Sequence, residues 1–339
     1  MSKTDFLHLL ETKPWLLADG ATGTNLFHMG LTSGDAPEMW NFDHPERVRQ
    51  LHRGFIEAGA DIILTNSFGG NRYRLKLHDA QDRVRAINMA AAGNARAEAD
   101  AAGRPVAVAG SMGPTGELFE PVGTLPNEQG VAAFAEQAAA LKEGGVDVLW
   151  IETMSSEEEL RAAVEGASTA KLPIVTTMSF DTNGRTMMGI TPRAFATLAT
   201  TLPKQPAAIG ANCGVGASEL IATILGITAA DPNAIVVAKG NCGIPQYVEG
   251  HIHYDGTPEL MAEYACIALD AGARIIGGCC GTTPQHLRAM RAALEAHEKG
   301  ERPSIEFVEQ RLGSVSALAK GIDAAAAAGA KRERRRARE

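Results

Sequence analysis

The chain has 339 residues, 45% of them hydrophobic, and Asp plus Glu exceed Lys plus Arg by 40 to 32, which gives a formal net charge of −8. An acidic chain with this much apolar material predicts a large globular core and argues against nucleic acid as the main partner. No signal peptide is evident, no apolar run approaches the roughly 20 residues that span a bilayer, and five cysteines do not form a typical secreted disulfide framework, so we expect a soluble, cytoplasmic protein without membrane contact.

Eight short apolar runs alternate with Ala-, Leu- and Glu-rich stretches of helical character. In chain order, the predicted strands are residues 15–18, 61–64, 106–110, 147–151, 174–178, 208–211, 235–238 and 274–276. The predicted helices are 45–58, 80–101, 128–143, 157–170, 192–201, 217–225, 258–271 and 284–297. Thr283 followed by Pro284 is typical of an N-cap and first helical residue. A longer insertion, residues 241–257, follows the seventh strand.

Strands that are apolar throughout and are each followed by a helix form parallel sheets. Eight such units favour a closed (β/α)8 barrel, or TIM barrel, over an open doubly wound sheet, which would usually stop at five or six strands. The open sheet is also disfavoured because no Gly-x-Gly-x-x-Gly follows the first strand. We therefore expect α/β class, with the barrel over residues 1–298.

Residues 299–339 are expected to form a short helical C-terminal extension. It contains the apolar residues Ile305, Phe307 and Val308, which suit either a homo-oligomer contact or a cap on the barrel floor. Close to residue 339 the chain carries the basic segment 331–336. A disordered, solvated tail is the simpler expectation for this segment, and contact with RNA or an acidic partner is the alternative.

Polar residues gather at the expected carboxyl ends of the strands, where TIM barrels carry their functional groups. The first strand runs into Asp19-Gly20, the second into Thr65, and the fourth into Glu152. An Asp-Gly pair after a strand is often only a turn. A carboxylate that closes an apolar strand, however, must find a partner inside the barrel mouth, and for Glu152 the alternative to a functional role is a buried ion pair with an arginine.

Two adjacent cysteines, Cys279 and Cys280, follow the eighth strand. Neighbouring cysteines close only a strained disulfide, whereas two thiolates side by side suit zinc. Cys213 ends the sixth strand and would complete a three-cysteine site with one open position. Cys242, in a second Asn-Cys-Gly, is the alternative third ligand. Cys266 is expected to be a small buried hydrophobic residue. A redox dithiol is one alternative. A phosphate-binding turn in a barrel lyase or isomerase is the other.

Five motifs together resemble the homocysteine S-methyltransferases, a family that includes betaine–homocysteine methyltransferase and the homocysteine-binding module of cobalamin-dependent methionine synthase. The motifs occur in the expected order over residues 12–298 and are DGATGT at 19–24, TNSF at 65–68, GPTGE at 113–117, NC at 212–213 and GGCCG at 277–281. The family fold is a (β/α)8 barrel. The resemblance implies that the chain is an enzyme, a zinc-dependent methyltransferase that converts homocysteine to methionine.

The resemblance also implies roles for individual residues. It makes Cys213, Cys279 and Cys280 the Zn2+ ligands and catalytic residues, with the sulfur of homocysteine as the fourth ligand. A free thiol is mostly protonated at neutral pH, and zinc deprotonates a thiol that coordinates it, so the metal would supply the nucleophile.

Four further positions match the substrate-binding residues of the family. The resemblance places Asp19 and Glu152 at the amino group of homocysteine. It places Gly20, through its backbone amide, and Thr65 near the carboxylate. Carboxylates that bind the ammonium group would make the enzyme prefer an amino acid to a thiol that has no amino group.

The methyl donor is less sharply indicated. Betaine is a quaternary ammonium that aromatic rings hold, yet residues 69–71 and 33–37 carry no aromatic where the animal betaine enzymes do. Trp40, Phe68 and Tyr73 lie nearby in the sequence. Phe68 is expected in the core and the other two on helix surfaces.

Residues 63–69 and 179–185 are closer to methionine synthase, but the chain has no second barrel or corrinoid domain. We favour betaine as donor, and the alternative is a homocysteine-binding subunit that works with a separate corrinoid protein.

Overall fold

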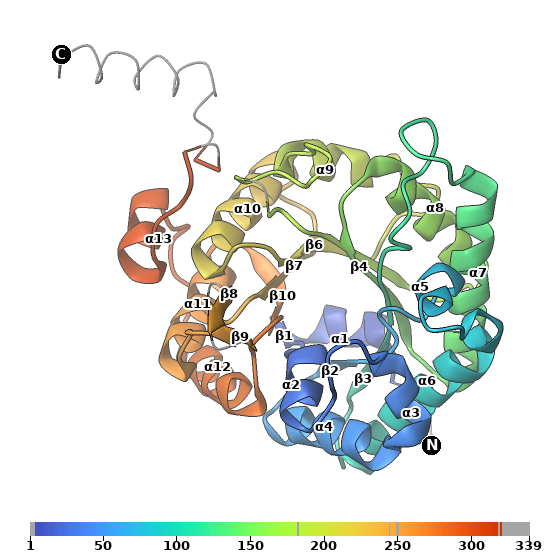
Figure 1. Ribbon diagram of the computed structural model, residues 1–339. Helices are drawn as coiled ribbons and strands as arrows, with labels where there is room; N and C mark the ends of the chain where they lie inside the picture. Colours follow the sequence, from blue (N-terminus) through green and yellow to red (C-terminus); the bar gives the residue numbers. More distant parts are fainter. Residues whose placement is uncertain (1–3, 182, 244, 249–250, 318, 321–339) are drawn as a thin grey trace.

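The computed structural model describes residues 4–320, except 182, 244, 249–250 and 318. Parallel strands form a ring that is surrounded by helices (Figure 1). The strands of the ring are β1 Leu16–Leu17, β2 Ile62–Leu64, β3 Ala107–Met112, β4 Val148–Met154, β5 Ile174–Met178, β6 Ala208–Cys213, β7 Val236–Gly240 and β10 Ala273–Gly278.

The ring is a closed barrel. Its strands pair in the order β1-β10-β7-β6-β5-β4-β3-β2, and all these pairs are parallel. The two ends of this order meet through a parallel bridge between Ala18 and Ile62, and the amide of Asp61 donates to the carbonyl of Leu17 at 2.7 Å. The predicted (β/α)8 barrel is therefore confirmed.

Each predicted helix is present outside the barrel. These helices are α4 Pro45–Glu57, α6 Val84–Ala101, α7 Asn127–Gly144, α8 Glu157–Ser168, α9 Pro192–Ala199, α10 Ala217–Ala230, α11 Pro258–Asp270 and α12 Pro284–Ala296. Thr283 caps α12 as predicted, in a capping box with His286. Shorter elements lie before and between them: α1 Phe6–Thr12, α2 Gly23–His28, η1 Pro37–Met39, α3 Trp40–Asp43, α5 Arg72–Lys76 and η2 Gln81–Arg83.

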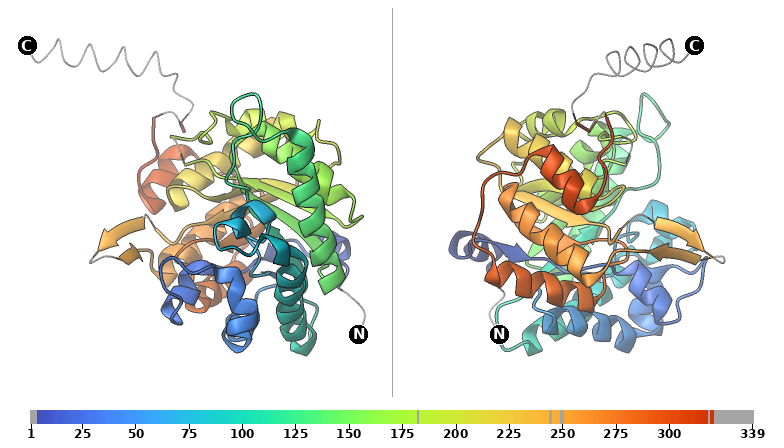
Figure 2. Two further views of the ribbon diagram at one scale, coloured as in Figure 1. Left: turned by 45° about the vertical axis from the view of Figure 1, so that its right-hand side comes forward. Right: turned by 90° about the vertical axis from the view of Figure 1, so that its left-hand side faces the viewer.

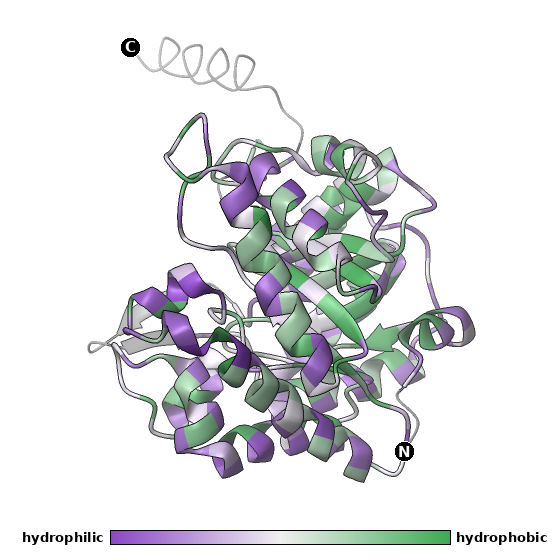
Figure 3. Ribbon diagram, turned by 90° about the vertical axis from the view of Figure 1, so that its right-hand side faces the viewer, coloured by the Kyte–Doolittle hydropathy of each residue, from purple (hydrophilic) through white to green (hydrophobic). Residues whose placement is uncertain are grey.

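The core has two layers. One fills the barrel, where Leu16, Ile62 and Trp150 pack together, and Phe6 and Leu9 of α1 belong to the same cluster. The other lies between the strands and the surrounding helices, whose outward faces are hydrophilic (Figure 3). The polar groups at the carboxyl ends of the strands lie directly above this apolar interior. Within the described residues, no helix is long and apolar enough to cross a membrane.

The insertion after β7 contains an antiparallel hairpin that the sequence analysis did not predict. Its strands, β8 Pro245–Val248 and β9 His251–Tyr254, project away from the barrel wall (Figure 2). The extension after the barrel forms α13, Ile305–Leu312, beside α10 and α11. Val308 is buried there and Phe307 is 46% exposed, so a homo-oligomer contact at α13 stays a prediction. The basic segment 331–336 lies outside the described residues.

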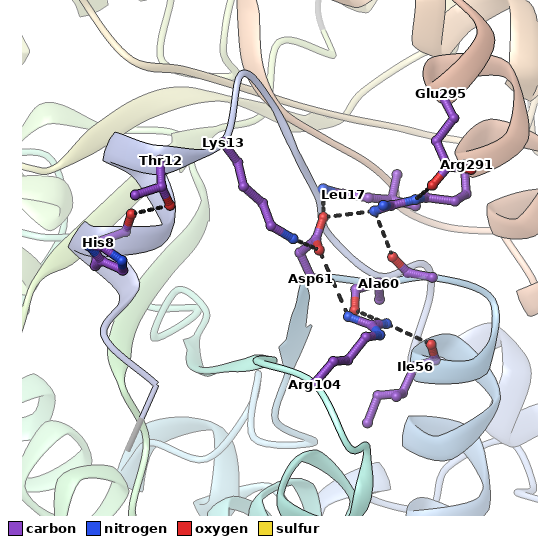
Figure 4. Close-up of polar contacts among 11 residues, drawn as sticks. His8, Thr12, Lys13, Leu17, Ile56, Ala60, Asp61, Arg104, Arg291 and Glu295 are labelled. Atoms are coloured by element: carbon purple, nitrogen blue, oxygen red, sulfur yellow. Dashed lines mark hydrogen bonds and ion pairs between the residues drawn. The ribbon is translucent and has the colours of Figure 1, made fainter. Parts of the chain in front are cut away.

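The seam between β1 and β2 is held by a buried carboxylate. Asp61 is 1% exposed, and its Oδ2 accepts from the amide of Leu17 at 2.9 Å (Figure 4). Three cations surround the carboxylate: Lys13 at 2.6 Å, Arg291 at 3.1 Å and Arg104 at 3.8 Å. These side chains come from the segment before β1, from α12 and from the loop before β3, so one charge joins distant parts of the chain at the amino-terminal end of the barrel.

We expect Asp61→Asn to lower the free energy of unfolding by about 3 kcal/mol, because three cations lose their buried partner. Urea denaturation would measure this change, with Asp43→Asn, at an exposed position on α3, as the control. Equal stability of the two variants would contradict a role for Asp61 in closing the seam.

His52 of α4 gives the fold an expected pH dependence. The side chain is 1% exposed, its Nε2 has no hydrogen-bond partner, and burial lowers its pKa from 6.5 to about 4, with only partial compensation from Glu98. The unfolded chain therefore binds a proton at higher pH than the folded chain does. The corresponding stability is complete above pH 6.5 and is lost as the pH falls towards 4.

We expect the wild-type protein to lose about 3 kcal/mol of stability from this group between pH 7 and pH 4. A His52→Met variant should lack that part of the pH dependence, whereas His28→Met, at an exposed position, should keep it. Urea denaturation at several pH values is the measurement, and parallel curves for wild type and His52→Met would contradict the assignment.

Candidate active site

The pairing of three neighbouring strands brings the cysteines together. Cys213 at the end of β6 is in register with Gly240 of β7, and Gly278 of β10 is in register with the same glycine from the other side. The amide of Cys279 then donates to the carbonyl of Gly240 at 2.7 Å. As a result, the Sγ atoms of Cys213, Cys279 and Cys280 all lie within 4.8 Å of one another.

Asn241 fixes the two loops that carry these cysteines. Cys213 has a φ of 62°, which is unfavourable for a residue with a side chain, and Gly214 follows it. The Nδ2 of Asn241 donates to the carbonyl of Gly214 at 2.8 Å, and its Oδ1 accepts from the amide of Cys280 at 3.1 Å. One side chain therefore ties the loop after β6 to the loop after β10 and helps hold Cys213 in its strained conformation.

Asn212 supports the cluster from the side of β4 and β5. Its Oδ1 accepts from the amide of Thr153 at 2.9 Å and from the hydroxyl of Thr177 at 2.6 Å, and its Nδ2 approaches the Sγ of Cys279 at 3.9 Å. The asparagines of the two Asn-Cys-Gly motifs thus position the site. Only the first motif also contributes its sulfur, because the thiol of Cys242 is buried and donates to the carbonyl of Gly256 at 3.1 Å.

The cluster fits a thiophilic cation. Zn–S bonds of about 2.3 Å place the sulfurs of a tetrahedral site about 3.8 Å apart, and three Sγ atoms that all lie within 4.8 Å of one another are close enough for such a site. The pKa of Cys213 is raised to about 11: its hydrogen bond with Cys279 lowers it, but the bond with Cys280 and burial raise it more. The pKa of Cys280 is raised to about 12, because the effects of Cys279 and burial outweigh the hydrogen bond with Cys213. Three such thiols can ionise together only if a cation offsets their charge.

Tyr254 covers the cysteines from the hairpin and was missed in the sequence. Its side chain lies close enough to the thiol of Cys280 for the two groups to influence each other's pKa. A side chain at Gly281, where φ is 81°, would come within 2.5 Å of the tyrosine ring, so this glycine lets the ring lie against the turn. Tyr254 was missed because no motif in the sequence indicates that the end of β9 lies against the turn at Gly281.

A buried ion pair lies beside the thiols, and one of its members was also missed. Asp19 follows β1 and is 1% exposed, and its Oδ1 lies 2.6 Å from the Nζ of Lys239, which is 2% exposed on β7. The other carboxylate oxygen accepts from the amide of Leu64 at 2.7 Å. Burial raises the pKa of Asp19, and the charge of Lys239 opposes that shift. The sequence signal for Lys239 was its position directly after the apolar run 235–238. From that position its side chain could point either into the barrel or towards the surrounding helices.

Glu152 connects this ion pair to the cysteines. It is 8% exposed at the end of β4, and its Oε1 accepts from the hydroxyl of Ser111 at 2.5 Å. Burial raises the pKa of Glu152, the charge of Lys239 lowers it, and Asp19 raises it again, so the three groups interact. Glu152 also raises the pKa of Cys279. In the described part of the chain Glu152 has no arginine partner, which removes the alternative of a buried Glu–Arg pair.

The remaining two predicted substrate-binding residues, Gly20 and Thr65, differ in whether their hydrogen-bonding groups already have partners in the protein. Gly20 fits only as glycine, since a Cβ there would lie 2.6 Å from the carbonyl oxygen of Thr282, and its own amide has no partner among the described residues. Thr65 is 2% exposed; its hydroxyl shares a 2.6 Å hydrogen bond with Ser67 and accepts from the amide of Ser111 at 3.0 Å. Gly20 therefore offers a free donor, whereas the hydroxyl of Thr65 is used within the scaffold.

The expectations for the nearby aromatic residues were partly wrong. Trp40 is buried in the core, 6% exposed, and Arg47 lies over its ring. Phe68, expected in the core, is 37% exposed and covers Gly113, where a Cβ would lie 2.6 Å from the ring. Tyr73 is partly buried against the core, so of the three only Phe68 exposes its ring substantially near the strand ends. Cys266, expected to be buried, is only partly so.

The sequence pattern that defines the homocysteine S-methyltransferases matches residues 16–294. The chain belongs to the homocysteine S-methyltransferase family. The family that the sequence motifs predicted is therefore confirmed.

Two curated relatives are both named methionine synthase. The protein of Mycobacterium tuberculosis is 31% identical over 315 residues, which cover 88% of this chain and 26% of the relative. That of Mycobacterium leprae is 31% identical over 331 residues, covering 93% and 27%. The chain thus spans about a quarter of the length of these relatives.

Solved structures agree with the fold. The homocysteine methyltransferase MmuM from Escherichia coli matches in its oxidised form with a TM-score of 0.72 and 24% identity, covering 86% of this chain and 99% of that one. Its metallated form matches with a TM-score of 0.70 and 25% identity, covering 84% and 98%.

We expect Cys213→Ser, Cys279→Ser and Cys280→Ser each to reduce bound zinc from about one equivalent to less than half, because a hydroxyl is a much poorer zinc ligand than a thiolate. Elemental analysis of the purified proteins is the measurement. Cys266→Ser is the control, since this cysteine lies outside the cluster on α11. A full equivalent of zinc in any one of the three variants would contradict the assignment of that residue.

Proposed function

We propose that this chain methylates the sulfur of L-homocysteine to form methionine, with the thiol activated on Zn2+ held by Cys213, Cys279 and Cys280. The observation that carries the proposal is the three-thiol cluster beside buried acidic groups at the carboxyl ends of the strands. Membership of the family and the metallated form of MmuM support it. We also propose that the enzyme acts in the cytoplasm, where thiols stay reduced.

Bound by three thiolates, Zn2+ would leave one position for the homocysteine sulfur and stabilise that sulfur as a thiolate at neutral pH. The chain's own residues do the rest. Asn212 and Asn241 hold the cysteine loops in place. A nucleophile that is fixed in this way can be aligned with the methyl carbon, and alignment supplies a large part of the rate of a displacement.

Polar groups around the cluster suit the amino acid part of the substrate. Glu152 and Asp19 provide negative charge for the α-ammonium group on the side of β4 and β1. The free amide of Gly20 is available to the α-carboxylate, with Thr65 forming the wall beside it. Together these groups favour a zwitterion that ends in a thiol over a simple thiol.

Betaine is the first candidate for the methyl donor. The ring of Phe68, in the loop after β2, is 37% exposed, and an exposed aromatic face suits a quaternary ammonium group. A single ring makes a weaker site for such a cation than a cage of several rings does.

A methylated corrinoid protein is the second candidate, and a different observation favours it. Leu118 and Val122, after β3, are 57% and 63% exposed, and Met187 and Met188, after β5, are 73% and 41% exposed. These loops lie on the same side of the barrel as the cysteines, and exposed apolar side chains in such a place suit a protein partner. The two relatives named methionine synthase add to this support.

We expect the zinc-loaded chain to form methionine from homocysteine with at least one of the two donors, betaine or a methylcobalamin-loaded corrinoid protein. Mass spectrometry would detect the product, and Cys279→Ser is the inactive control. Leu118→Asp combined with Met187→Asp should weaken turnover with the corrinoid protein and leave turnover with betaine unchanged. Absence of methionine with both donors would contradict the proposed function.

A further inference from the structure

We infer that the segment after α13 positions the loop that carries Cys213 and thereby tightens the binding of the metal ion. We call this segment, residues 313–317 and 319–320, the strap. The inference rests on the proposed function, because it takes Cys213 to be a zinc ligand. It gives a role in the site to a part of the chain that lies outside the barrel.

The link between β6 and α10 has few constraints of its own. Of its four residues, 213–216, Cys213 has a φ of 62°, Gly214 of 76° and Gly216 of 142°. The glycines leave this link free to take other conformations, and the positive φ of Cys213 is unfavourable. Gly216 is the N-cap of α10, and no side chain caps the helix there. Besides the bonds of Asn241, the position of Cys213 therefore depends on how the first turn of α10 is held.

The strap holds that first turn. The hydroxyl of Ser218 donates to the carbonyl of Ser314 at 3.1 Å. The Oε1 of Glu219 accepts from the amide of Ser316 at 2.6 Å. Ser218 and Glu219 belong to the first turn of α10, and both are 8% exposed. Two hydrogen bonds thus join the strap to the residues that directly follow the link carrying Cys213.

The strap is itself anchored to α13 and to the core. Glu309 of α13 holds it at two points, since its Oε1 accepts from the amide of Val315 at 3.0 Å and its Oε2 lies 2.8 Å from the Nζ of Lys320. Val315 is 5% exposed and belongs to the cluster between the strands and the helices. A segment that is anchored in this way can restrain α10, whereas a loose one could not.

The strap also lies against the loop after β5. A Cβ at Gly184 would come within 2.6 Å of the Cα of Ala319 and 2.7 Å of its Cβ, so the strap fits here only because Gly184 has no side chain. The chain therefore passes from α13 beside α10 to the loop after β5 (Figure 1). It contacts elements on both sides of the link that carries Cys213.

Two glycines of the loop after β5 give a matched test in the full-length chain. Gly184 and Gly189 both have a positive φ, 75° and 86°, but a Cβ at Gly189 would meet nothing within 4 Å. Gly184→Ala must push the strap away, and Gly189→Ala carries a similar backbone strain without that contact. We expect Gly184→Ala to weaken zinc binding about tenfold, as loss of a group that holds a metal ligand does, and Gly189→Ala to leave it unchanged. Competition with a chromogenic zinc chelator measures the affinity.

Glu219 provides an independent pair of variants. Glu219→Ala removes the acceptor for the amide of Ser316 and should also weaken zinc binding about tenfold. Glu219→Gln keeps an oxygen that can accept this bond and should stay close to wild type. Thermal unfolding of the zinc-free proteins shows whether each variant is folded, since a purely structural role would lower stability without changing the affinity for zinc. If Glu219→Ala does not fold, the two glycine variants still decide.

Hydrogen exchange on the zinc-free chain tests the strap without the metal. The amides of residues 213–220 should exchange faster in Gly184→Ala than in wild type or Gly189→Ala. The inference is overturned if Gly184→Ala binds zinc as tightly as Gly189→Ala, or if these amides exchange at the same rate in both. If wild type binds no zinc, the proposed function fails, and the exchange rates alone decide whether the strap positions the loop.

Discussion

The pairing of β6 and β10 with opposite edges of β7 is the constraint on which the site depends. Gly240 is in register with Cys213 on one side and with Gly278 on the other, so the ends of three parallel strands fix where the thiols can lie. Tyr264 of α11 supports the same point, because its hydroxyl accepts from the amide of Gly240 at 3.0 Å. A slip of one residue in either pairing would turn a cysteine away from the cluster.

Charge is managed differently at the two ends of the barrel. At the amino-terminal end, Asp61 is surrounded by three cations that are themselves partly exposed, which favours stability. At the other end, Asp19 and Glu152 share the buried cation Lys239, and unpaired thiols lie next to them. That end therefore remains short of positive charge, which a metal ion and an ammonium group would supply.

Much of the fold and part of the site could be predicted from the sequence. The alternation of apolar runs and helical stretches located each strand of the barrel, and convergence of strand ends in a barrel predicted that Cys213 meets Cys279 and Cys280. Lys239 could not be predicted, because a lysine at a strand end normally reaches solvent and only the tertiary fold buries it beside Asp19. The predictions for the aromatic residues were wrong for the same reason. The burial of Trp40 and the exposure of Phe68 depend on packing between elements that are far apart in the chain.

The first and last strands of the barrel along the chain lie side by side. β1, near the start of the described chain, pairs with β10, which immediately precedes Cys279, and Ala21 and Asn25 hydrogen-bond to the carbonyl of Thr282. The cluster of three thiols is therefore incomplete until β10 and the two cysteines that follow it have been synthesised. If the cluster holds a metal ion, as proposed, that ion would be bound only at the end of barrel folding, and a nascent chain stalled before β10 would lack a finished site for it.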